Sequence, residues 1–455
     1  MKITILGGAG TRVPLIVVGL LRFHDELRTE EVVLWDTNEA RQPLIERIGW
    51  ALTQRYGIPL KIRTARSAEE ALEGTDCAIS SIRVGGAAAR VADEEIALAH
   101  GTLGQETVGA GGWAMALRTI PPMLEYARAM NRLAPRAWLL NFTNPVGIVL
   151  QATLAAGCER VIGVCDTPRE LFEAVAAELK MESQEAFFDY FGLNHLGWLR
   201  RVLVGGLDQL ARLFQAPDRL ARLYPLSLFA SRFLQELKLL PTEYLYFYYR
   251  AGEAAQNIRR QQTTRGRMVS EQEQQLFSEL ARDGTNPERI LAAYETYLAQ
   301  RTATYFHLET GAPNREEEVE KARRELYTRA AGYERIAVDV LRAIRTHHTT
   351  VMPVDVANAG SIDGLAASDA VEVPCVIDGN GARPLAVGAV PAAVQDLFFQ
   401  VKDYERLTVQ AALDGSAARA AEALAANPLI RDRGLAEKVT QEYRRAHQPW
   451  LDYLR

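Results

Sequence analysis

Three glycines close to the N-terminus have the spacing of a phosphate-binding turn. Gly7, Gly8 and Gly10 lie between a short apolar run and a segment of helical length. Glycine tolerates a positive φ and the close approach of a pyrophosphate, and a helix N-terminus supplies N–H donors. Gly8 and Gly10 match the first two glycines of the dinucleotide fingerprint, while Val13 replaces the third. Asp36, after the second apolar run, could bind a ribose diol and favours NAD; the alternative is a turn without a ligand.

A thiol, a carboxylate and an imidazole form a second candidate set. Cys165 and Asp166 end another apolar run, and His195 follows in Phe-Gly-Leu-Asn-His-Leu-Gly-Trp. A thiolate and an imidazole suit a borderline divalent ion, with substrate oxygens completing an open coordination shell. The alternative is a small buried cysteine and a histidine without a ligand, and spacing alone does not separate the two interpretations.

Amides, phenols and guanidinium groups complete the candidates. Asn144, in Asn-Phe-Thr-Asn-Pro, offers a donor and an acceptor to a sugar hydroxyl or a nicotinamide amide, or belongs to an ordinary Asn-Pro turn. Tyr244 begins a segment rich in tyrosine, and it can act as a base only if a cation lowers its pKa from about 10. The later tyrosines of that segment favour an aromatic strip packed in the core. Arg83, Arg90 and Arg265 could bind a phosphate group, or could be solvated surface charges.

The elements that must position these residues alternate between strand and helix over the first 170 positions. Apolar runs at 2–6, 31–35, 77–82, 137–140 and 160–164 predict strands, and 13–21, 40–56 and 169–180 predict helices. This order predicts a parallel sheet with ligands at the carboxyl ends of its strands. Beyond it, 187–198 leads into a strand, 207–214 is predicted to be helical, and helices dominate to about 348. Strands return at 350–357 and 371–377, and helices at 394–426 and 435–453 close the chain.

The predicted fold class is α/β. A Rossmann-like, parallel-sheet, NAD-binding domain is expected over 1–168. An α+β domain is expected over 169–455, providing substrate, metal and oligomer contacts.

Composition excludes several classes of protein. The 455 residues are more than one compact core usually holds, so two lobes are expected. The hydrophobic fraction of 48% and charged fraction of 24% are typical of a globular protein, and the net charge of -5 argues against a nucleic-acid partner. No apolar stretch is long enough to span a membrane, and the N-terminus lacks a signal-peptide pattern. Four scattered cysteines do not form a disulfide scaffold, so a cytoplasmic protein with reduced thiols is expected.

Several motifs in the same order resemble a known family. They are Ile5-Leu-Gly-Gly-Ala-Gly-Thr, Gly104-Gln-Glu-Thr-Val-Gly-Ala-Gly-Gly-Trp, Asn141-Phe-Thr-Asn-Pro, Gly163-Val-Cys-Asp, Gly192-Leu-Asn-His-Leu and Asn358-Ala-Gly-Ser-Ile. The chain resembles glycoside hydrolase family 4, the NAD- and manganese-dependent glycosidases, and looks most like its 6-phospho-β-glucosidases. NAD-dependent members of this family do not use two-carboxylate hydrolysis.

The resemblance implies a role for individual residues. The metal ligands fall on Cys165 and His195, and the catalytic base falls on Tyr244. The sugar-phosphate contact falls on Arg90, with Arg265 as a second candidate. The remaining implied contacts are to the sugar (Asn144, Asn194) and to NAD (Gly7, Gly8, Gly10, Thr11, Asp36, Arg83). A homodimer or homotetramer acting on a small phosphorylated disaccharide or glucoside is also implied.

The implied reaction explains why a glycosidase would bind NAD. Hydride leaves C3 of the sugar to NAD, and the metal polarises the resulting ketone, which makes the C2 proton acidic enough for Tyr244 to remove. The aglycone is eliminated from C1, water adds, and the earlier steps reverse, so NAD is regenerated in each turnover.

Two positions depart from the phospho-β-glucosidase pattern. Asp166 stands where those enzymes usually have Asn, and phospho-α-glucosidases usually have an Asp that is assigned as the acid for the leaving group. Tyr246 stands where the family has Arg. We expect a β-glucosidase, with an α-glucosidase or another family 4 glycosidase as the alternative. A 2-hydroxy-acid dehydrogenase and a non-catalytic NAD sensor are further alternatives from other functional classes.

Overall fold

The computed structural model describes residues 1–282, 284, 286–312, 316–327, 332–346, 348–430 and 432–455. Its first part is a parallel sheet with the strand order β3-β2-β1-β4-β5-β6, the order typical of dinucleotide-binding folds. The strands are β1 (Lys2–Leu6), β2 (Glu31–Trp35), β3 (Lys61–Thr64), β4 (Cys77–Ser80), β5 (Trp138–Asn141) and β6 (Val161–Gly163). The predicted Rossmann-like sheet is therefore confirmed. The edge strand β3 was missed because its Lys-Ile-Arg-Thr sequence contains no apolar run.

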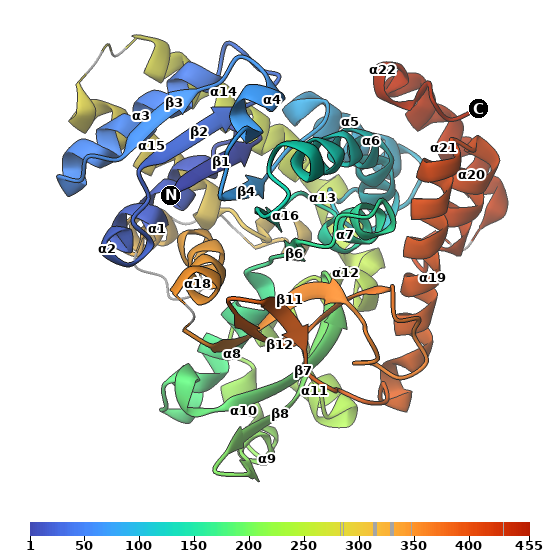
Figure 1. The fold of residues 1–455 in the computed structure, drawn as a ribbon. Coiled ribbons are helices and arrows are strands. Elements are labelled where there is room, and N and C mark those ends of the chain that lie inside the picture. The colour runs from blue at the N-terminus through green and yellow to red at the C-terminus, as the bar shows by residue number, and fades with distance from the viewer. Residues whose placement is uncertain (283, 285, 313–315, 328–331, 347, 431) are drawn as a thin grey trace.

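The sheet does not end at β6. Strand β11 (Thr350–Ala357) pairs antiparallel with β6, and the order continues through β12 (Ala370–Asp378), β7 (Phe187–Leu193), β8 (Leu196–Val204) and β10 (Leu240–Pro241). Strand β13 (Gly381–Pro384) pairs with β12, and β9 (Leu207–Asp208) pairs with β8. Figure 1 shows β11 and β12, in orange, between β6 and the green strands β7 and β8. Because one sheet runs through both parts of the chain, the domain boundary at 168/169 stays a prediction.

Helices cover the parallel part and join it to the rest. The first eight are α1 (Val13–Arg22), α2 (His24–Leu27), α3 (Gln42–Tyr56), α4 (Ala68–Leu72), α5 (Gly86–Ala99), α6 (Gly109–Leu133), α7 (Val146–Ala155) and α8 (Thr167–Leu179). The middle of the chain contributes α9 (Leu210–Phe214), α10 (Pro217–Leu220), α11 (Ser231–Leu237), α12 (Leu245–Tyr249), α13 (Ala251–Gln261), α14 (Arg265–Arg282), α15 (Pro287–Ala303), α16 (His307–Thr310), α17 (Glu316–Arg324) and α18 (Tyr333–Thr346). The C-terminal helices are α19 (Ala392–Asp414), α20 (Ala417–Ala426), α21 (Arg433–Ala446) and α22 (Gln448–Leu451), and two short 3-10 turns occupy Ser183–Glu185 and Leu226–Leu228.

Three helical predictions were too long. The predicted helix at 207–214 begins as β9, and α9 starts only at Leu210. The predicted helix at 394–426 is two helices, because Gly415 adopts a left-handed conformation that ends α19. The predicted helix at 435–453 likewise ends at Ala446, and α22 follows as a separate short helix.

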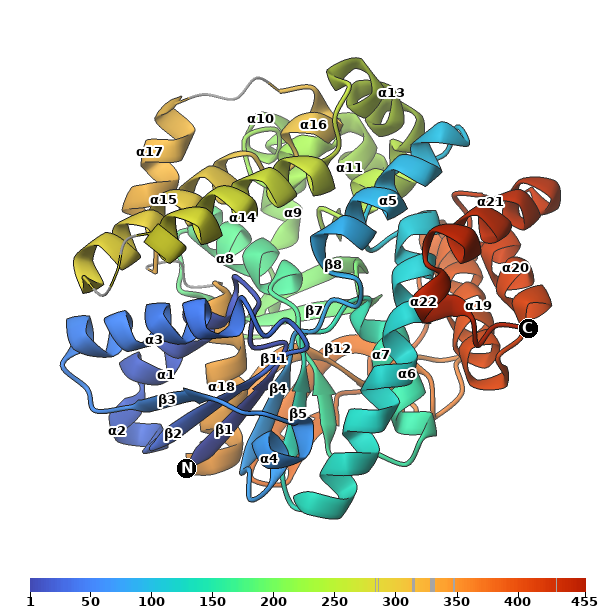
Figure 2. The same cartoon turned by 90° about the horizontal axis from the view of Figure 1, so that it is seen from above.

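Two groups of later helices pack against the parallel part. Helix α15 packs on α3, and α14 packs on α5 (Figure 2). The C-terminal helices pack on the other side, with α19 against α6 and α7 and with α21 against α5. Residues far apart in sequence thus reach the carboxyl ends of the first strands. No helix among the described residues has the length and apolar composition needed to cross a bilayer.

Candidate active site

A cavity of about 1230 Å³ lies at the carboxyl ends of the parallel strands. Its lining includes twelve of the predicted site residues: Gly7, Gly10, Thr11, Asp36, Arg83, Arg90, Asn144, Cys165, Asp166, His195, Tyr244 and Arg265. Gly8 and Asn194 are not among its lining residues. The fold therefore gathers most of the candidates, which come from segments between positions 7 and 265, around one space.

The glycine turn is closely packed between two strands. The N–H groups of Gly7 and Gly8 both donate to the carbonyl of Trp35, at 2.9 and 2.8 Å. Gly7 has a φ of +93°, and a Cβ there would lie 2.4 Å from the carbonyl oxygen of Ser81. A Cβ on Gly8 would lie 2.7 Å from the Cβ of Leu34, so Gly8 is needed for contact with β2. Gly7 and Gly10 remain at the cavity wall, which is where the fingerprint places a pyrophosphate.

Asp36 connects the end of β2 to this turn. Its carboxylate accepts hydrogen bonds from the N–H of Ala9, at 3.1 Å, and from the N–H of Asn38, at 2.8 Å. A carboxylate has about four acceptor positions, so these two bonds leave capacity for a ribose diol. The position of Asp36 in the cavity lining is consistent with the predicted NAD contact.

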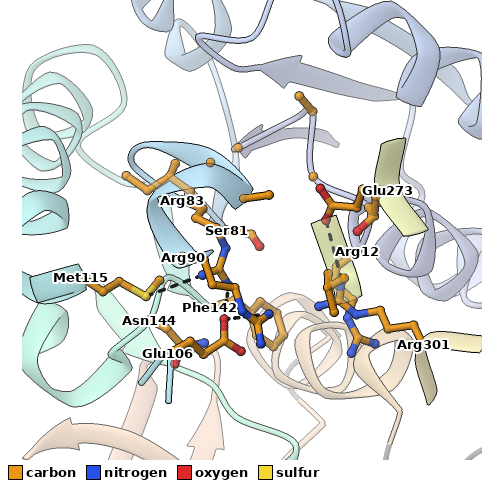
Figure 3. A pocket seen from close by; sticks show the side chains of 18 of the residues that line it. Arg12, Ser81, Arg83, Arg90, Glu106, Met115, Phe142, Asn144, Glu273 and Arg301 are labelled. Atoms are coloured by element: carbon orange, nitrogen blue, oxygen red, sulfur yellow. Dashed lines mark hydrogen bonds and ion pairs between the residues drawn. The ribbon is translucent and has the colours of Figure 1, made fainter. Parts of the chain in front are cut away.

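Arg83 and Arg90 converge on a carboxylate that the sequence did not single out. The same oxygen of Glu106 lies 2.7 Å from Arg83 and 3.0 Å from Arg90, and Figure 3 shows both arginines pointing toward it. Arg90 is also paired with Glu94, at 2.9 Å. Burial raises the pKa of Glu106, but Arg90 and Arg83 outweigh burial and lower that pKa to about 2. Arg90 is thus already balanced by two carboxylates, and a phosphate group would have to share it with them.

Arg265 and Thr11 are both tied to helix α15. Arg265 donates to the carbonyl of Thr304, at 3.1 Å, and to that of Arg301, at 2.5 Å, so it caps the C-terminal end of this helix. The hydroxyl of Thr11 is 2.9 Å from that of Tyr297, which accepts a hydrogen bond from Arg301 at 2.7 Å. Arg301 itself lines the cavity and lies near Glu273 and Arg12 in Figure 3.

Cys165 and His195 both line the cavity and are both buried. Cys165 is a free thiol, and burial, with Glu372 and Asp166 adding to it, raises its pKa well above the ordinary value. Burial lowers the pKa of His195 to about 3, so its imidazole is neutral and keeps a lone pair for a metal ion. The Oδ1 atom of Asn144, in the same lining, is buried and has no hydrogen-bond partner in the described part of the chain. These donors fit a borderline divalent ion.

The described residues contain no group of three or more His, Cys, Asp or Glu side chains that could hold a metal ion. With two protein donors, a metal ion bound by Cys165 and His195 would keep positions open for oxygen atoms of a substrate. Open positions are the feature that distinguishes catalytic from structural metal sites.

Tyr244 stacks face to face on His195, with ring centroids 3.7 Å apart and an interplanar angle of 1°. The hydroxyl of Tyr305 donates to that of Tyr244 at 3.2 Å. Burial, followed by the negative charges of Glu106 and Glu243, raises the pKa of Tyr244 well above the ordinary value. The phenol is thus protonated in this environment, and a bound cation is the change that would lower its pKa.

Asn194 lies apart from the cavity lining. Its side-chain amide donates to Glu372 at 3.3 Å, and Glu372 also accepts a hydrogen bond from Tyr190 at 2.5 Å. Its predicted contact with the sugar stays a prediction, because in this arrangement Asn194 is bound to β12 instead.

Further charged side chains in the lining were also missed, among them Arg12, Glu106, Glu243 and Arg301. Glu106 lies inside a motif that supported the family resemblance, so that motif was a usable signal. Glu243 directly precedes Tyr244, but only Tyr244 was identified as a candidate from the sequence. Arg12 directly follows the glycine turn, whereas Arg301 lies on a helix with no distinguishing pattern.

Family models match both halves of the chain. The model described as family 4 glycosyl hydrolase matches residues 2–181, and the family 4 glycosyl hydrolase C-terminal domain matches residues 190–430. The chain belongs to glycosyl hydrolase family 4. This result confirms the predicted family and enzyme class, and it removes the alternatives of a 2-hydroxy-acid dehydrogenase and a non-catalytic sensor.

Relatives within family 4 match nearly the whole chain. The 6-phospho-β-glucosidase of Escherichia coli is 31% identical, covering 99% of this chain and 96% of its own length. The 6-phospho-β-glucosidase of Thermotoga maritima, solved with manganese, NAD+ and glucose-6-phosphate, has a TM-score of 0.80 and 26% identity, with 99% of each chain covered. A 6-phospho-α-glucosidase from gut microorganisms, solved with NAD and glucose-6-phosphate, has a TM-score of 0.82 and 26% identity, covering 99% of this chain and 98% of its own. Relatives of both anomeric specificities thus share this fold.

Proposed function

We propose that this family 4 glycosyl hydrolase cleaves 6-phospho-β-glucosides with NAD and a divalent metal ion such as Mn²⁺. The observation that carries the proposal is a single cavity lined by the glycine turn, by Cys165 and His195, and by Tyr244. A cofactor turn, a thiol and an imidazole that can bind a metal ion, and a phenol have no common purpose in simple two-carboxylate hydrolysis. They are the groups needed for a reaction that passes through a transient oxidation of the sugar.

The residues present fit both cofactors. Gly7, Gly10, Thr11, Asp36 and Arg83 would hold NAD, and Cys165 with His195 would hold the metal ion. When bound, NAD supplies a hydride acceptor and the metal ion supplies a Lewis acid next to the sugar. The thiol and the imidazole are largely buried, with 9% and 6% of these residues exposed, where they line the cavity.

Tyr244 would hold and return the proton at C2 of the sugar. Its ring is fixed against His195, so its hydroxyl is kept near the metal-binding side of the cavity. Tyr305 donates a hydrogen bond to this hydroxyl and would stabilise its ionised form. Arg90 and Arg265 would face the 6-phosphate group, and the Oδ1 atom of Asn144 would accept from a sugar hydroxyl or coordinate the metal ion.

The 6-phospho-α-glucosides are the second candidate substrates. Asp166 lines the cavity next to Cys165, which is the position of the acid assigned in enzymes that act on the α anomer.

The remaining proposals concern the compartment and the oligomeric state of the enzyme. We propose a cytoplasmic homodimer or homotetramer, and the four cysteines are consistent with a reducing compartment because they are buried free thiols.

The test is cleavage of 4-nitrophenyl 6-phosphoglucosides of both anomers, with NAD, Mn²⁺ and a reductant. We expect faster cleavage of the β anomer, and loss of activity when NAD or the metal is removed. Unphosphorylated glucosides serve as the control for the phosphate contact. Faster cleavage of the α anomer would favour the second candidate, and cleavage that survives removal of both cofactors would overturn the proposal.

Within the same assay, Tyr244→Phe tests the base. Because this variant lacks the phenol that would remove the C2 proton, exchange of that proton with deuterium from the solvent should fall at least about 100-fold. Tyr248→Phe is the matched control, since Tyr248 does not line the cavity. NAD binding should be equal in both variants. Unchanged exchange in Tyr244→Phe would assign the base to another group.

A further inference from the structure

Glu243 is a buried carboxyl group on the wall of the cavity, directly before Tyr244. Its side chain lines the cavity, and only 2% of the residue is exposed. The backbone around it is fixed at both ends. The N–H of Thr242 donates to the carbonyl of Gly197 at 3.0 Å, and the carbonyl of Glu243 accepts from Tyr246 at 3.0 Å. The backbone of Glu243 is therefore fixed between the end of β10 and helix α12.

The two carboxyl oxygens of Glu243 have different surroundings. Oε1 accepts a hydrogen bond from the hydroxyl of Thr167 at 2.9 Å. Oε2 is buried and has no hydrogen-bond partner in the part of the chain that the structure describes. A buried ionised oxygen without a donor is costly, so a proton on Oε2 or a polar ligand group next to it would remove the cost.

Burial and neighbouring charges favour the protonated form of this carboxyl group. Burial raises the pKa of Glu243 to about 8, and the carboxylates of Glu170 and Asp166 act in the same direction. Glu106, which lies in the same cavity lining, is held ionised by Arg90 and Arg83. Two carboxyl groups whose pKa values are pushed apart by their environments are the usual sign of a division between an acid and a fixed anion.

The carboxyl group of Glu243 is next in the chain to the proposed base, and both side chains line the same cavity.

We propose that Glu243 is the proton donor to the leaving group of the glycoside. This inference rests on the function proposed above. As Tyr244 takes the proton from C2, the bond between C1 and the aglycone oxygen breaks and its electron pair stays on that oxygen. The aglycone oxygen then takes the proton of the Glu243 carboxyl group. When water adds, its oxygen bonds to C1 and its proton returns to Glu243, while Tyr244 returns a proton to C2. Both side chains end each turnover in their starting forms.

Asp166 is the competing donor, because the family assigns an acid at that position in enzymes for the α anomer. The two candidates can be separated by the leaving group. A nitrophenolate departs without a proton, whereas the oxygen of a simple alcohol needs one. Removal of the donor should therefore impair a methyl glycoside and largely spare a 4-nitrophenyl glycoside.

The experiment uses the enzyme loaded with NAD and Mn²⁺, with methyl and 4-nitrophenyl 6-phospho-β-glucosides as substrates. In Glu243→Gln we expect kcat for the methyl glycoside to fall at least about 100-fold and kcat for the nitrophenyl glycoside to fall less than about 10-fold. Exchange of the C2 proton should continue, because Tyr244 is intact. Glu236→Gln, at an exposed site on α11, is the matched control. Asp166→Asn is measured alongside.

Equal losses on both substrates in Glu243→Gln would indicate a structural role and overturn the inference. A selective loss in Asp166→Asn, with none in Glu243→Gln, would assign the donor to Asp166 and overturn it as well. If Glu243→Gln does not fold, Glu243→Asp keeps an acid and should retain a methyl to nitrophenyl rate ratio within about 10-fold of wild type. A ratio that falls further would contradict the inference. Failure of the wild-type enzyme to cleave either substrate would instead overturn the proposed function.

Discussion

At the scale of single residues, Gly7 has little freedom to change. Its φ of +93° disfavours any side chain, and a Cβ would lie 2.4 Å from the carbonyl oxygen of Ser81. Gly57 also has a positive φ, of +64°, but a Cβ there would meet no other atom within 4 Å. It is therefore a control that has the backbone strain of a positive φ without the steric clash. We expect Gly57→Ala to cost about 1 kcal/mol of unfolding free energy and Gly7→Ala to cost about 3 kcal/mol. Only Gly7→Ala should weaken the binding of NAD, as measured by titration. Equal losses of stability, with NAD binding retained, would contradict this role for the turn.

The same residue type behaves differently according to its neighbours. Glu106 and Glu243 both line the cavity, but the pKa of Glu106 is lowered to about 2 beside Arg90 and Arg83, whereas burial raises that of Glu243 to about 8. The sequence identified neither carboxyl group as a site residue, and nothing local to either position predicts its ionisation. Charge at these positions is a property of the assembled cavity.

At the scale of elements, the junction between the two parts of the sheet contains a pair of carboxyl groups. Asp355 on β11 is in register with Glu372 on β12, and these residues are flanked by Gly163 on β6 and Gly192 on β7. Both carboxyl groups are buried. Burial raises the pKa of Glu372 to about 7, and burial together with Glu372 raises that of Asp355. Between pH 4.5 and about 7, the pair therefore holds protons in the folded state that the same carboxyl groups would release in the unfolded chain.

This pair predicts how stability depends on pH. Acids whose pKa is raised by folding stabilise the protein below their unfolded pKa, and this contribution is lost as the pH rises through the folded pKa. The contribution of this pair to the free energy of unfolding of the cofactor-free enzyme should thus fall as the pH rises from about 4.5 toward about 7. Asp355→Asn removes one of these two acids. The unfolding free energy of this variant should therefore decline less over the same pH range than that of the wild type, by an amount on the order of 2 kcal/mol. Urea unfolding at several pH values measures the difference, and parallel curves for both proteins would contradict the prediction.

At the scale of the whole molecule, one buried carboxylate joins the N-terminal part to the C-terminal helices. Asp93 on α5 accepts two hydrogen bonds from Arg118 on α6, at 2.8 and 2.6 Å. A ring nitrogen of His447, just after α21, lies 2.8 Å from the same carboxylate, and Tyr443 donates to the backbone carbonyl of Asp93. Pro449 and Trp450, which follow His447, reach the cavity wall. The end of the chain is thus held against the site.

Loss of this carboxylate should therefore loosen the C-terminal helices. Asp93→Ala leaves the buried Arg118 without its partner, which typically costs about 3 kcal/mol or more of unfolding free energy. We also expect faster proteolysis of the segment after Ala446, measured by mass spectrometry of the fragments. Glu437→Gln breaks the exposed ion pair with Arg433 and should change stability by less than about 1 kcal/mol. Equal stability of the two variants would show that Asp93 does not hold the C-terminus.

Much of the N-terminal half and part of the site could be predicted from the sequence. The apolar runs of β1, β2 and β4 to β6 alternate with helical segments, and this local order is enough to specify a parallel sheet. Six motifs in the same order were enough to identify the family. The polar edge strand β3 was missed because strand prediction depended on apolar runs, and the break at Gly415 was missed because one residue's φ ends the helix there.

The sequence by itself determined the dinucleotide-type sheet, the glycine turn and the chemical types of the candidate side chains, because each depends on residues close together in the chain. Only the tertiary structure decided that β11 extends the sheet from β6, and that Glu106, Glu243 and Arg301 line the cavity. It also decided that Asn194 is bound to Glu372. The physical reason is that long-range contacts, burial and ionisation depend on which distant segments pack together. A local sequence pattern does not specify that packing.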